Sequence, residues 1–253
     1  MTRLPRGLAL PIAALIAWET SGRTLFQPTD TLTRPSAMAA ALVQAGMDGS
    51  LVQATAETLA GAAIGFLIAS VLGTAAGIVL GSSRILGGVA GPTVELLRPI
   101  PAVALIPLGL LIFGFGVRME VMTVAFACLW PVMTVASAAV KGIDPRLIEV
   151  SRTLEIGRLE QALKFILPSI FPRLFVGLRL AAGVALVVAV TVEIAANPQG
   201  LGYRLILAQQ NLRPDLAFGL LTWIGCLGWV LNRGLVGVER RYFWRFAPAK
   251  RNA

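Results

Sequence analysis

Six long apolar stretches constrain this chain more than any other feature of its sequence. A helix needs about 20 mostly apolar residues to cross a bilayer. Hydrocarbon cannot hydrogen-bond the backbone, so only helices and closed barrels span membranes. We therefore predict an all-α polytopic membrane protein with about six transmembrane helices. The predicted spans lie at approximately 8–25, 51–80, 89–115, 119–140, 174–196 and 216–238.

The amino-acid composition supports this assignment. Hydrophobic residues make up 56% of the 253 residues and charged residues 14%, whereas soluble domains carry about 25% charged residues. The chain has no histidine, which excludes His-based metal sites and Ser-His triads. Cys128 and Cys226 lie in apolar runs without CxxC spacing, so we expect two buried apolar side chains. We predict no catalytic residue and no metal site in this chain.

The first apolar stretch has two interpretations. A basic start at Arg3 and Arg6, followed by an apolar run, is typical of a signal peptide. No small-x-small cleavage site follows before residue 20. An uncleaved first membrane helix is therefore the favoured interpretation.

The basic residues predict the orientation of the chain. With the N-terminus in the cytoplasm, 15 Lys and Arg residues fall on the cytoplasmic side and 5 on the opposite side, while Arg98 and Arg179 fall within spans. Cytoplasmic connections of membrane proteins carry an excess of Lys and Arg. Both termini and the connection at 141–173 are therefore predicted to be cytoplasmic.

The connection at 141–173 has a helical pattern. Asp144 and Pro145 are typical of a helix start, and apolar residues follow at spacings of three and four. Gly157 is predicted to break this helix or to form its C-cap, and a second short helix at 158–166 is predicted to end before Pro168. The apolar stripe consists of Leu147, Ile148, Val150, Ser151 and Leu154. Such a stripe either packs on a soluble partner or lies on the inner leaflet as an amphipathic helix.

The spacing of this connection resembles the EAA loop of binding-protein-dependent ABC importer permeases. That family pattern is Glu-Ala-Ala, three to five residues, Gly, about nine residues, then an apolar residue, Leu and Pro. Here Glu149 and Gly157 occupy the corresponding positions, and Val150 and Ser151 replace the two alanines. The resemblance implies that coupling to an ATPase is carried by Glu149, Val150, Ser151, Leu154, Gly157, Leu167 and Pro168.

Two further segments resemble the nitrate/sulfonate/taurine branch of the family. They are Leu-Leu-Arg-Pro-Ile-Pro at 96–101 with Ile-Pro-Leu at 106–108, and Val-Glu-Ile at 192–194 before Gly-Leu-Gly-Tyr at 200–203. The resemblance covers about 51–241. It implies a permease core there, an N-terminal transmembrane helix with an extracytoplasmic connection at 1–50, and a cytoplasmic tail at 242–253.

The resemblance also implies partners and a function. The expected fold is that of a type I ABC importer permease with a cytoplasmic coupling helix, in the bacterial inner membrane. Two identical copies would form the pore, two cytoplasmic ABC ATPase subunits would dock on the coupling loops, and an extracytoplasmic solute-binding protein would deliver a small anion such as a sulfonate, taurine or nitrate. The chain has no Gly-x4-Gly-Lys-Ser/Thr motif, so ATP and Mg are expected on the ATPase and no cofactor on this chain. Import by alternating access is expected, with membrane lipid around the chain and no nucleic acid.

Arg98, Pro99 and Pro101 are candidates for the translocation pathway. A charge inside an apolar span usually faces a cavity, a partner or an interface. The two prolines interrupt the helix, and irregular backbone at membrane depth lines a cavity or is buried in protein. Arg98 could there attract an anion. The alternative is an arginine that reaches the interface or pairs with Glu95 or another acid.

Glu193, near the outer end of the fifth span, is a weaker pathway candidate. Pairing with Arg204 or Arg213 is the favoured interpretation. The following segment predicts a turn from residue 197 and a short amphipathic helix at 203–212 on the outer surface. By resemblance, the binding protein docks near this helix.

Small residues spaced by four mark a helix face that permits close approach. Gly61 and Gly65 form one such pair and Gly73 and Gly77 another. This pattern fits packing within one chain as well as packing between two chains.

Two other classes of protein remain as alternatives. An ATP-independent secondary carrier predicts an internal repeat, and none is found between the halves of the chain. A membrane-embedded enzyme predicts a cluster of reactive side chains, and no span contains a histidine or a group of acids.

Overall fold

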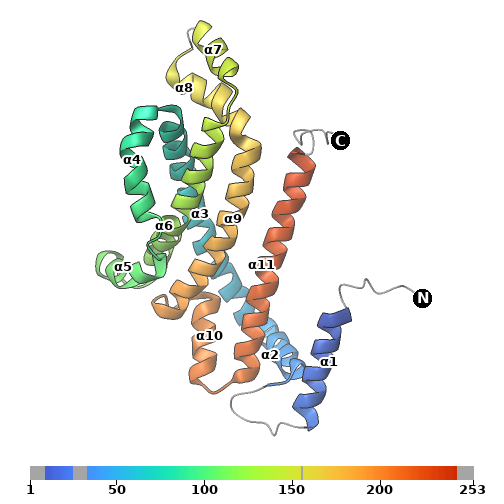
Figure 1. The fold of residues 1–253 in the computed structure, drawn as a ribbon. Coiled ribbons are helices and arrows are strands. Elements are labelled where there is room, and N and C mark those ends of the chain that lie inside the picture. The colour runs from blue at the N-terminus through green and yellow to red at the C-terminus, as the bar shows by residue number, and fades with distance from the viewer. Residues whose placement is uncertain (1–8, 25–32, 155, 244–253) are drawn as a thin grey trace, which may run out of the picture.

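The computed structural model describes residues 9–24, 33–154 and 156–243, and every regular element in these ranges is helical (Figure 1). In chain order the elements are α1 (Ala9–Thr24), α2 (Pro35–Met47), α3 (Ser50–Ser82), α4 (Arg84–Leu97), the 3-10 helix η2 (Ala102–Leu105), α5 (Ile106–Phe113), α6 (Val117–Lys141), α7 (Pro145–Thr153), α8 (Arg158–Gln161), the π-helical turn η3 (Ala162–Ile166), α9 (Leu167–Ala195), α10 (Gly200–Gln210) and α11 (Pro214–Phe243). The predicted all-α fold is confirmed.

Five of the six predicted spans have counterparts in the structure. Helices long and apolar enough to cross a membrane occur at Ser50–Ser82, Val117–Lys141, Leu159–Ala195 and Pro214–Arg241. The predicted third span is a bent pair, in which α4 and the η2–α5 segment differ in direction by 81°. The prolines after α4 cause this break, as predicted. The first span stays a prediction, because α1 has 16 described residues and residues 8 and 25 lie outside the described ranges.

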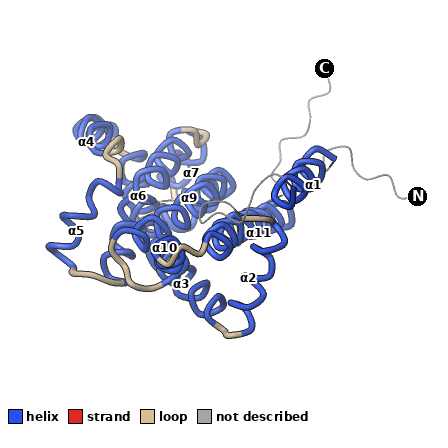
Figure 2. The backbone as a smooth tube through the Cα atoms, turned by 90° about the horizontal axis from the view of Figure 1, so that it is seen from below, coloured by secondary structure: helices blue, strands red, loops and turns tan. Residues whose placement is uncertain are grey.

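Helices α3, α6 and α9 form the centre of the molecule, with α4 and α5 on one side and α1, α2 and α11 on the other (Figure 2). Their shared core consists largely of small side chains, such as Ala69, Cys128, Ala136 and Ala181. Small residues at helix contacts allow the backbones to approach closely in a membrane.

The glycine face of α3 packs on α6 of the same chain. A Cβ added at Gly65 would lie 2.7 Å from Val124 Cβ, and a Cβ at Gly77 would lie 2.6 Å from the Met133 carbonyl oxygen. Gly73 leaves similar room for the Leu129 carbonyl. These contacts decide what the sequence pattern left open, because they assign the small-residue stripe to packing within the chain.

Helix α2 was not expected from the sequence. Residues 1–50 were predicted as one helix and a connection, but the connection forms α2, with Pro35 in its first turn. Met38 and Ala41 are buried, and Gly219 of α11 faces the Met38 carbonyl, which a Cβ would approach to 3.2 Å. Tertiary packing on α11 therefore stabilises a helix that is too short to be recognised as a span.

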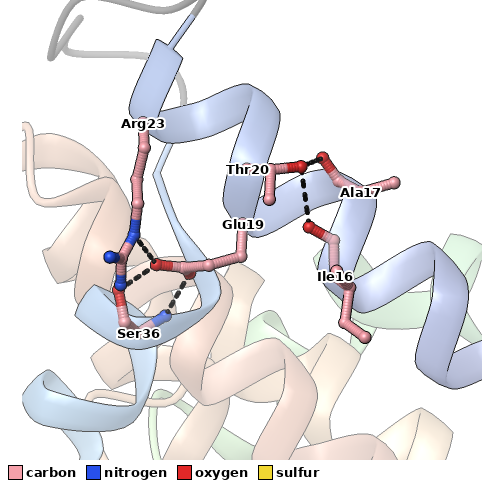
Figure 3. Close-up of polar contacts among 6 residues, drawn as sticks. All are labelled: Ile16, Ala17, Glu19, Thr20, Arg23 and Ser36. Carbon is pink, nitrogen blue, oxygen red and sulfur yellow. Dashed lines mark hydrogen bonds and ion pairs between the residues drawn. The ribbon is translucent and has the colours of Figure 1, made fainter.

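One carboxylate joins α1 to α2 (Figure 3). Glu19 accepts hydrogen bonds from Arg23 Nε at 2.8 Å, from the Ser36 backbone N–H at 3.0 Å and from Ser36 Oγ at 2.9 Å. The apolar side chains of α1 are otherwise largely uncovered, and Leu10 is 80% exposed. Most of the α1 surface therefore faces lipid or a partner.

The two cysteines have different surroundings. Cys128 is buried, and its Sγ lies 3.3 Å from the Ala181 carbonyl oxygen, to which it donates. Cys226 is exposed on α11, so the prediction that both are buried is wrong for Cys226. Lipid-facing and core-facing positions of a membrane helix are both apolar, so hydrophobicity alone does not separate them.

Candidate functional site

The connection between α6 and α9 projects beyond the ends of the long helices at one end of the molecule (Figure 1). Helix α7 begins at Pro145. Asp144 Oδ1 accepts a hydrogen bond from the Arg146 N–H at 3.0 Å, which is the geometry of an N-cap. The predicted helix start is confirmed.

Gly157 starts the second helix of this loop. Its carbonyl accepts the first hydrogen bond of α8, from the Gln161 N–H at 2.8 Å, as an N-cap residue does. The prediction that Gly157 forms the C-cap of the first helix is therefore wrong. Helix α7 ends earlier, at Thr153, where the Ile156 N–H donates to the Ser151 carbonyl at 3.3 Å.

Ser151 ties the two helices of the loop together. Its side chain is 1% exposed, and its Oγ accepts a hydrogen bond from Gln161 Nε2 at 2.6 Å. The sequence placed Ser151 on the apolar stripe, but the structure turns it into the loop. An alanine at this position, as in the family pattern, could not make this bond.

Apolar side chains on the outer surface of the loop are uncovered. Glu149 is also exposed there, while the side chains of Ile148 and Val150 lie outside the described residues. The exposed apolar residues are Leu147 at 44%, Leu154 at 61%, Leu159 at 75% and Leu163 at 56%. Exposed apolar patches mark sites of interaction with a protein or a membrane. This surface is called the loop face below.

The loop continues into α9 without a break. The π-helical turn η3 joins α8 to α9, so the prediction that a helix ends before Pro168 is wrong. Pro168 lies in the first turn of α9 and is exposed, and Leu167 is half-buried. A π-turn changes the local hydrogen-bond register, which lets a helix pass a proline.

A small apolar cluster anchors this turn to the central helices. Ile166 and Ile170 are 5% and 1% exposed and pack against Ala139 and Val140 at the end of α6. This cluster joins the end of the loop to α6 and to the start of α9.

An open cavity of about 760 Å³ lies between the loop and the α3–α4 turn. Its lining carries Glu149 from α7 together with Arg84 and Lys141. The structure thus places Glu149 at the rim of a basic opening at the base of the loop.

Arg98 lies at the end of α4, directly before the break at Pro99 and Pro101. All three residues are exposed. Arg98 lines a second cavity, of about 250 Å³, with Glu95 and Lys141. Among the residues that the structure describes, Arg98 forms no ion pair with Glu95, so the predicted alternative of an Arg98–Glu95 pair is not supported.

Glu193 pairs with neither arginine that the sequence suggested. It is 1% exposed, and its Oε2 accepts a hydrogen bond from the Gly202 N–H at 2.8 Å. Within the described ranges, Arg213 pairs instead with Asp215 at 3.1 Å. The favoured pairing prediction is therefore wrong, because the partner is the backbone at the start of α10.

Further polar side chains meet Glu193 at this place. Glu57 Oε2 accepts from the Gly200 N–H and Thr58 Oγ1 from the Leu201 N–H, each at 2.9 Å. Asn197 Nδ2 donates to Glu120 Oε2 at 2.5 Å. These residues form what we call the carboxylate junction: Glu57, Thr58, Glu120, Glu193 and Asn197.

The sequence contains a signal for this junction that no single span shows. Glu57, Glu120 and Glu193 come from three different predicted spans. In the predicted topology all three lie near the same ends of their spans, so depth alone would have brought them together. In the described part of the chain, no group of His, Cys, Asp or Glu has the arrangement of a metal site.

The family profile described as "Binding-protein-dependent transport system inner membrane component" matches residues 69–238. A putative ABC transporter permease protein of Methanocaldococcus jannaschii is 32% identical over 94% of this chain and 91% of its own length. The putative aliphatic sulfonates transport permease protein SsuC of Bacillus subtilis is 28% identical over 95% and 87%. The taurine transport system permease protein TauC of Escherichia coli is 30% identical over 86% and 79%.

Solved structures share the fold. A chain of the MetNI methionine ABC transporter in an inward-facing conformation has a TM-score of 0.67 and 20% identity, covering 78% of this chain and 97% of that one. A chain of an amino acid ABC transporter solved with histidines has a TM-score of 0.58 and 18% identity, covering 79% and 97%.

Proposed function

Because the chain belongs to the family of inner membrane components of binding-protein-dependent transport systems, we propose that it is the pore-forming subunit of an ATP-driven importer. The loop face carries this proposal. A soluble partner or the inner leaflet can cover an apolar surface that projects from the end of a membrane protein. The EAA-like spacing of the loop favours the soluble partner.

The partner proposed for the loop face is a pair of cytoplasmic ABC ATPase subunits, which bind the ATP and Mg. Leu147 and Leu154 would fill an apolar cleft of the ATPase, and Glu149 would meet its polar rim. The Ser151–Gln161 hydrogen bond holds α7 and α8 in one arrangement. A loop fixed in this way passes on the movement of its partner instead of yielding to it.

The pore itself is proposed to form between two copies of the chain. In the proposed cycle of alternating access, a loaded extracytoplasmic binding protein docks on the side of α10, and ATP brings the two loop faces together. The pore then opens outward, and hydrolysis returns it inward. Both termini are placed in the cytoplasm in this arrangement.

The solute is proposed to be a small anion. Relatives of the chain are named for aliphatic sulfonates, taurine, bicarbonate and nitrate. Arg98 and Lys141 bring two positive charges to the 250 Å³ cavity against one negative charge from Glu95. Arg98, with the interrupted backbone at Pro99 and Pro101, is the proposed anion-attracting part of the pathway. Glu193 is proposed to affect the pathway indirectly, because its hydrogen bond to Gly202 sets the position of α10.

Co-purification tests the proposed function. The tagged chain is isolated from its native cells in mild detergent, and the retained proteins are identified by mass spectrometry. A stoichiometric P-loop ATPase supports the proposal. A chain that is isolated alone in several detergents and shows no ATP-dependent uptake in vesicles contradicts it.

Glu149→Lys tests the loop face itself. We expect normal membrane insertion, loss of transport and weaker retention of the ATPase, because the reversed charge meets Arg84 and Lys141 and the rim of the partner. Asp215→Lys makes the same charge change outside the loop and serves as the control for ATPase retention. Normal transport by Glu149→Lys contradicts docking through this face.

A further inference from the structure

We propose that Glu57, Thr58 and Glu193 hold the beginning of α10 to α3 and α9, so that α10 moves with these two helices during transport. The proposal concerns the carboxylate junction, at the end of the molecule opposite the loop face (Figure 1). Only its consequence for transport rests on the proposed function. The attachment itself is a property of the chain.

The first backbone N–H groups of α10 bond to side chains of other helices. The initial N–H groups of a helix have no partner within the helix, and side-chain caps usually come from the residue just before it. Here that residue, Gln199, provides no side-chain cap. The three donors instead bond to side chains that are distant in sequence: Gly200 to Glu57, Leu201 to Thr58 and Gly202 to Glu193.

The start of α10 is also an electrostatic partner for carboxyl groups. The beginning of a helix carries a partial positive charge that favours nearby carboxylates. The carboxyl oxygens of Glu57 and Glu193 lie there as acceptors, and neither side chain forms an ion pair with a basic side chain in the described residues. The amino-terminal end of α10 is thus the positive group that these carboxylates contact.

Glycines shape the space in which the carboxylate junction lies. Gly200 has a φ of +86°, and a Cβ at Gly202 would lie 2.7 Å from Glu193 Cβ. Gly61 of α3 leaves the space that the Glu120 carboxylate occupies. Gly61 and Gly200 therefore leave space for the carboxyl groups of Glu120 and Glu193, and Gly202 lets the start of α10 approach the backbone of α9. Glu120 adds α6 to the same junction through Asn197.

The hydrogen bonds at the start of α10 are buried. Thr58, Glu193 and Leu201 are at most 1% exposed. Hydrogen bonds away from water are stronger, and an unmade one is costly. Separation of α10 from α3 and α9 would leave three backbone donors and their acceptors unpaired. Displacement of α10 together with those helices keeps every bond, and is therefore the favoured movement.

Paired substitutions of Thr58 test the attachment. Thr58→Val has nearly the same shape but no acceptor for the Leu201 N–H, whereas Thr58→Ser keeps the hydroxyl. Hydrogen exchange is followed by mass spectrometry in the peptide 197–204, on the purified full-length chain. Because loss of a buried hydrogen bond shifts a local opening equilibrium by about tenfold, we expect about tenfold faster exchange in Thr58→Val and wild-type rates in Thr58→Ser. Equal rates in all three proteins overturn the attachment.

The consequence for transport is measured on the copurified complex in proteoliposomes. We expect Thr58→Val to lower stimulation of ATP hydrolysis by the loaded binding protein several-fold and to leave unstimulated hydrolysis unchanged, because α10 lies far from the loop face. Thr58→Ser should retain stimulation. Faster exchange with unchanged stimulation overturns the role of α10 in transport. Absence of ATP hydrolysis in the wild-type complex instead refutes the proposed function, and the exchange result still decides the attachment.

Discussion

Single hydroxyl and carboxyl groups make the connections that the apolar sequence cannot specify. Ser151 joins α7 to α8 through Gln161, Thr58 joins α3 to α10 through Leu201, and Glu19 joins α1 to α2 through Ser36. Apolar contacts between membrane helices have little directional preference, so a few buried polar bonds fix which surfaces meet.

The fold of this chain does not require a glycine at position 157. A Cβ there would meet nothing within 4 Å, and its φ is not in the left-handed region. Since serine is a good N-cap residue, Gly157→Ser should fold with an unchanged melting temperature. We expect ATPase retention and transport to fall, because an added side chain would obstruct close approach of the partner to the loop.

Gly49→Ala is the contrasting variant. Gly49 also has free space but a φ of +79°, so an alanine there should cost about 1 kcal/mol of stability while ATPase retention stays normal. Full transport by Gly157→Ser would show that the glycine serves no partner.

Among the elements, α3 and α6 form the tightest pair. The stripe of glycines on α3 meets backbone carbonyls and valine side chains of α6, so this contact depends on the absence of side-chain atoms. Dispersion between closely packed atoms and weak hydrogen bonds to carbonyls stabilise such contacts.

Gly65→Ala should separate these helices. The added methyl group would lie 2.7 Å from Val124 Cβ and 2.8 Å from the Val121 carbonyl oxygen, and overpacking typically costs about 1–3 kcal/mol. Thermal unfolding in detergent, followed by tryptophan fluorescence, measures the loss. Gly225→Ala on α11, where a Cβ meets nothing within 4 Å, should change stability by less than about 0.5 kcal/mol. Equal effects of both variants would contradict the packing account.

The sequence was sufficient for elements that are defined locally. Long apolar runs specified α3, α6, α9 and α11, and prolines specified the break after α4. It was insufficient where contacts are distant in sequence: α10 begins at Gly200 instead of residue 203, because side chains 143 residues away bind its first donors. The coupling residues stay a prediction from a spacing pattern, and the burial of Ser151 depends on a tertiary bond that no spacing shows.

At the scale of the whole molecule, the charges and the fold agree on two distinct ends. Helix α11 finishes at the end where α7 and α8 project, and α2 and α10 lie at the other end (Figure 1). The α3–α4 turn with Arg84 and the connection at 141–173, both predicted to be cytoplasmic, lie at the first of these ends. If the loop face lies in the cytoplasm, the proposed orientation of the whole chain follows.

Reporter fusions measure this orientation. Green fluorescent protein fused after Ala253 should fluoresce, and alkaline phosphatase fused there should be inactive, because each reporter functions on one side of the membrane only. Fusions after Arg213, between α10 and α11, should give the reverse pattern. Active phosphatase after Ala253 would contradict the proposed orientation.

The helical run Leu159–Ala195 connects the two ends of the molecule without interruption. Its 37 residues make a rod about 55 Å long at about 1.5 Å per residue. One end belongs to the loop face and the other carries Glu193. In the proposed cycle, a displacement of the loop would therefore reach the other end of the molecule through one continuous helix.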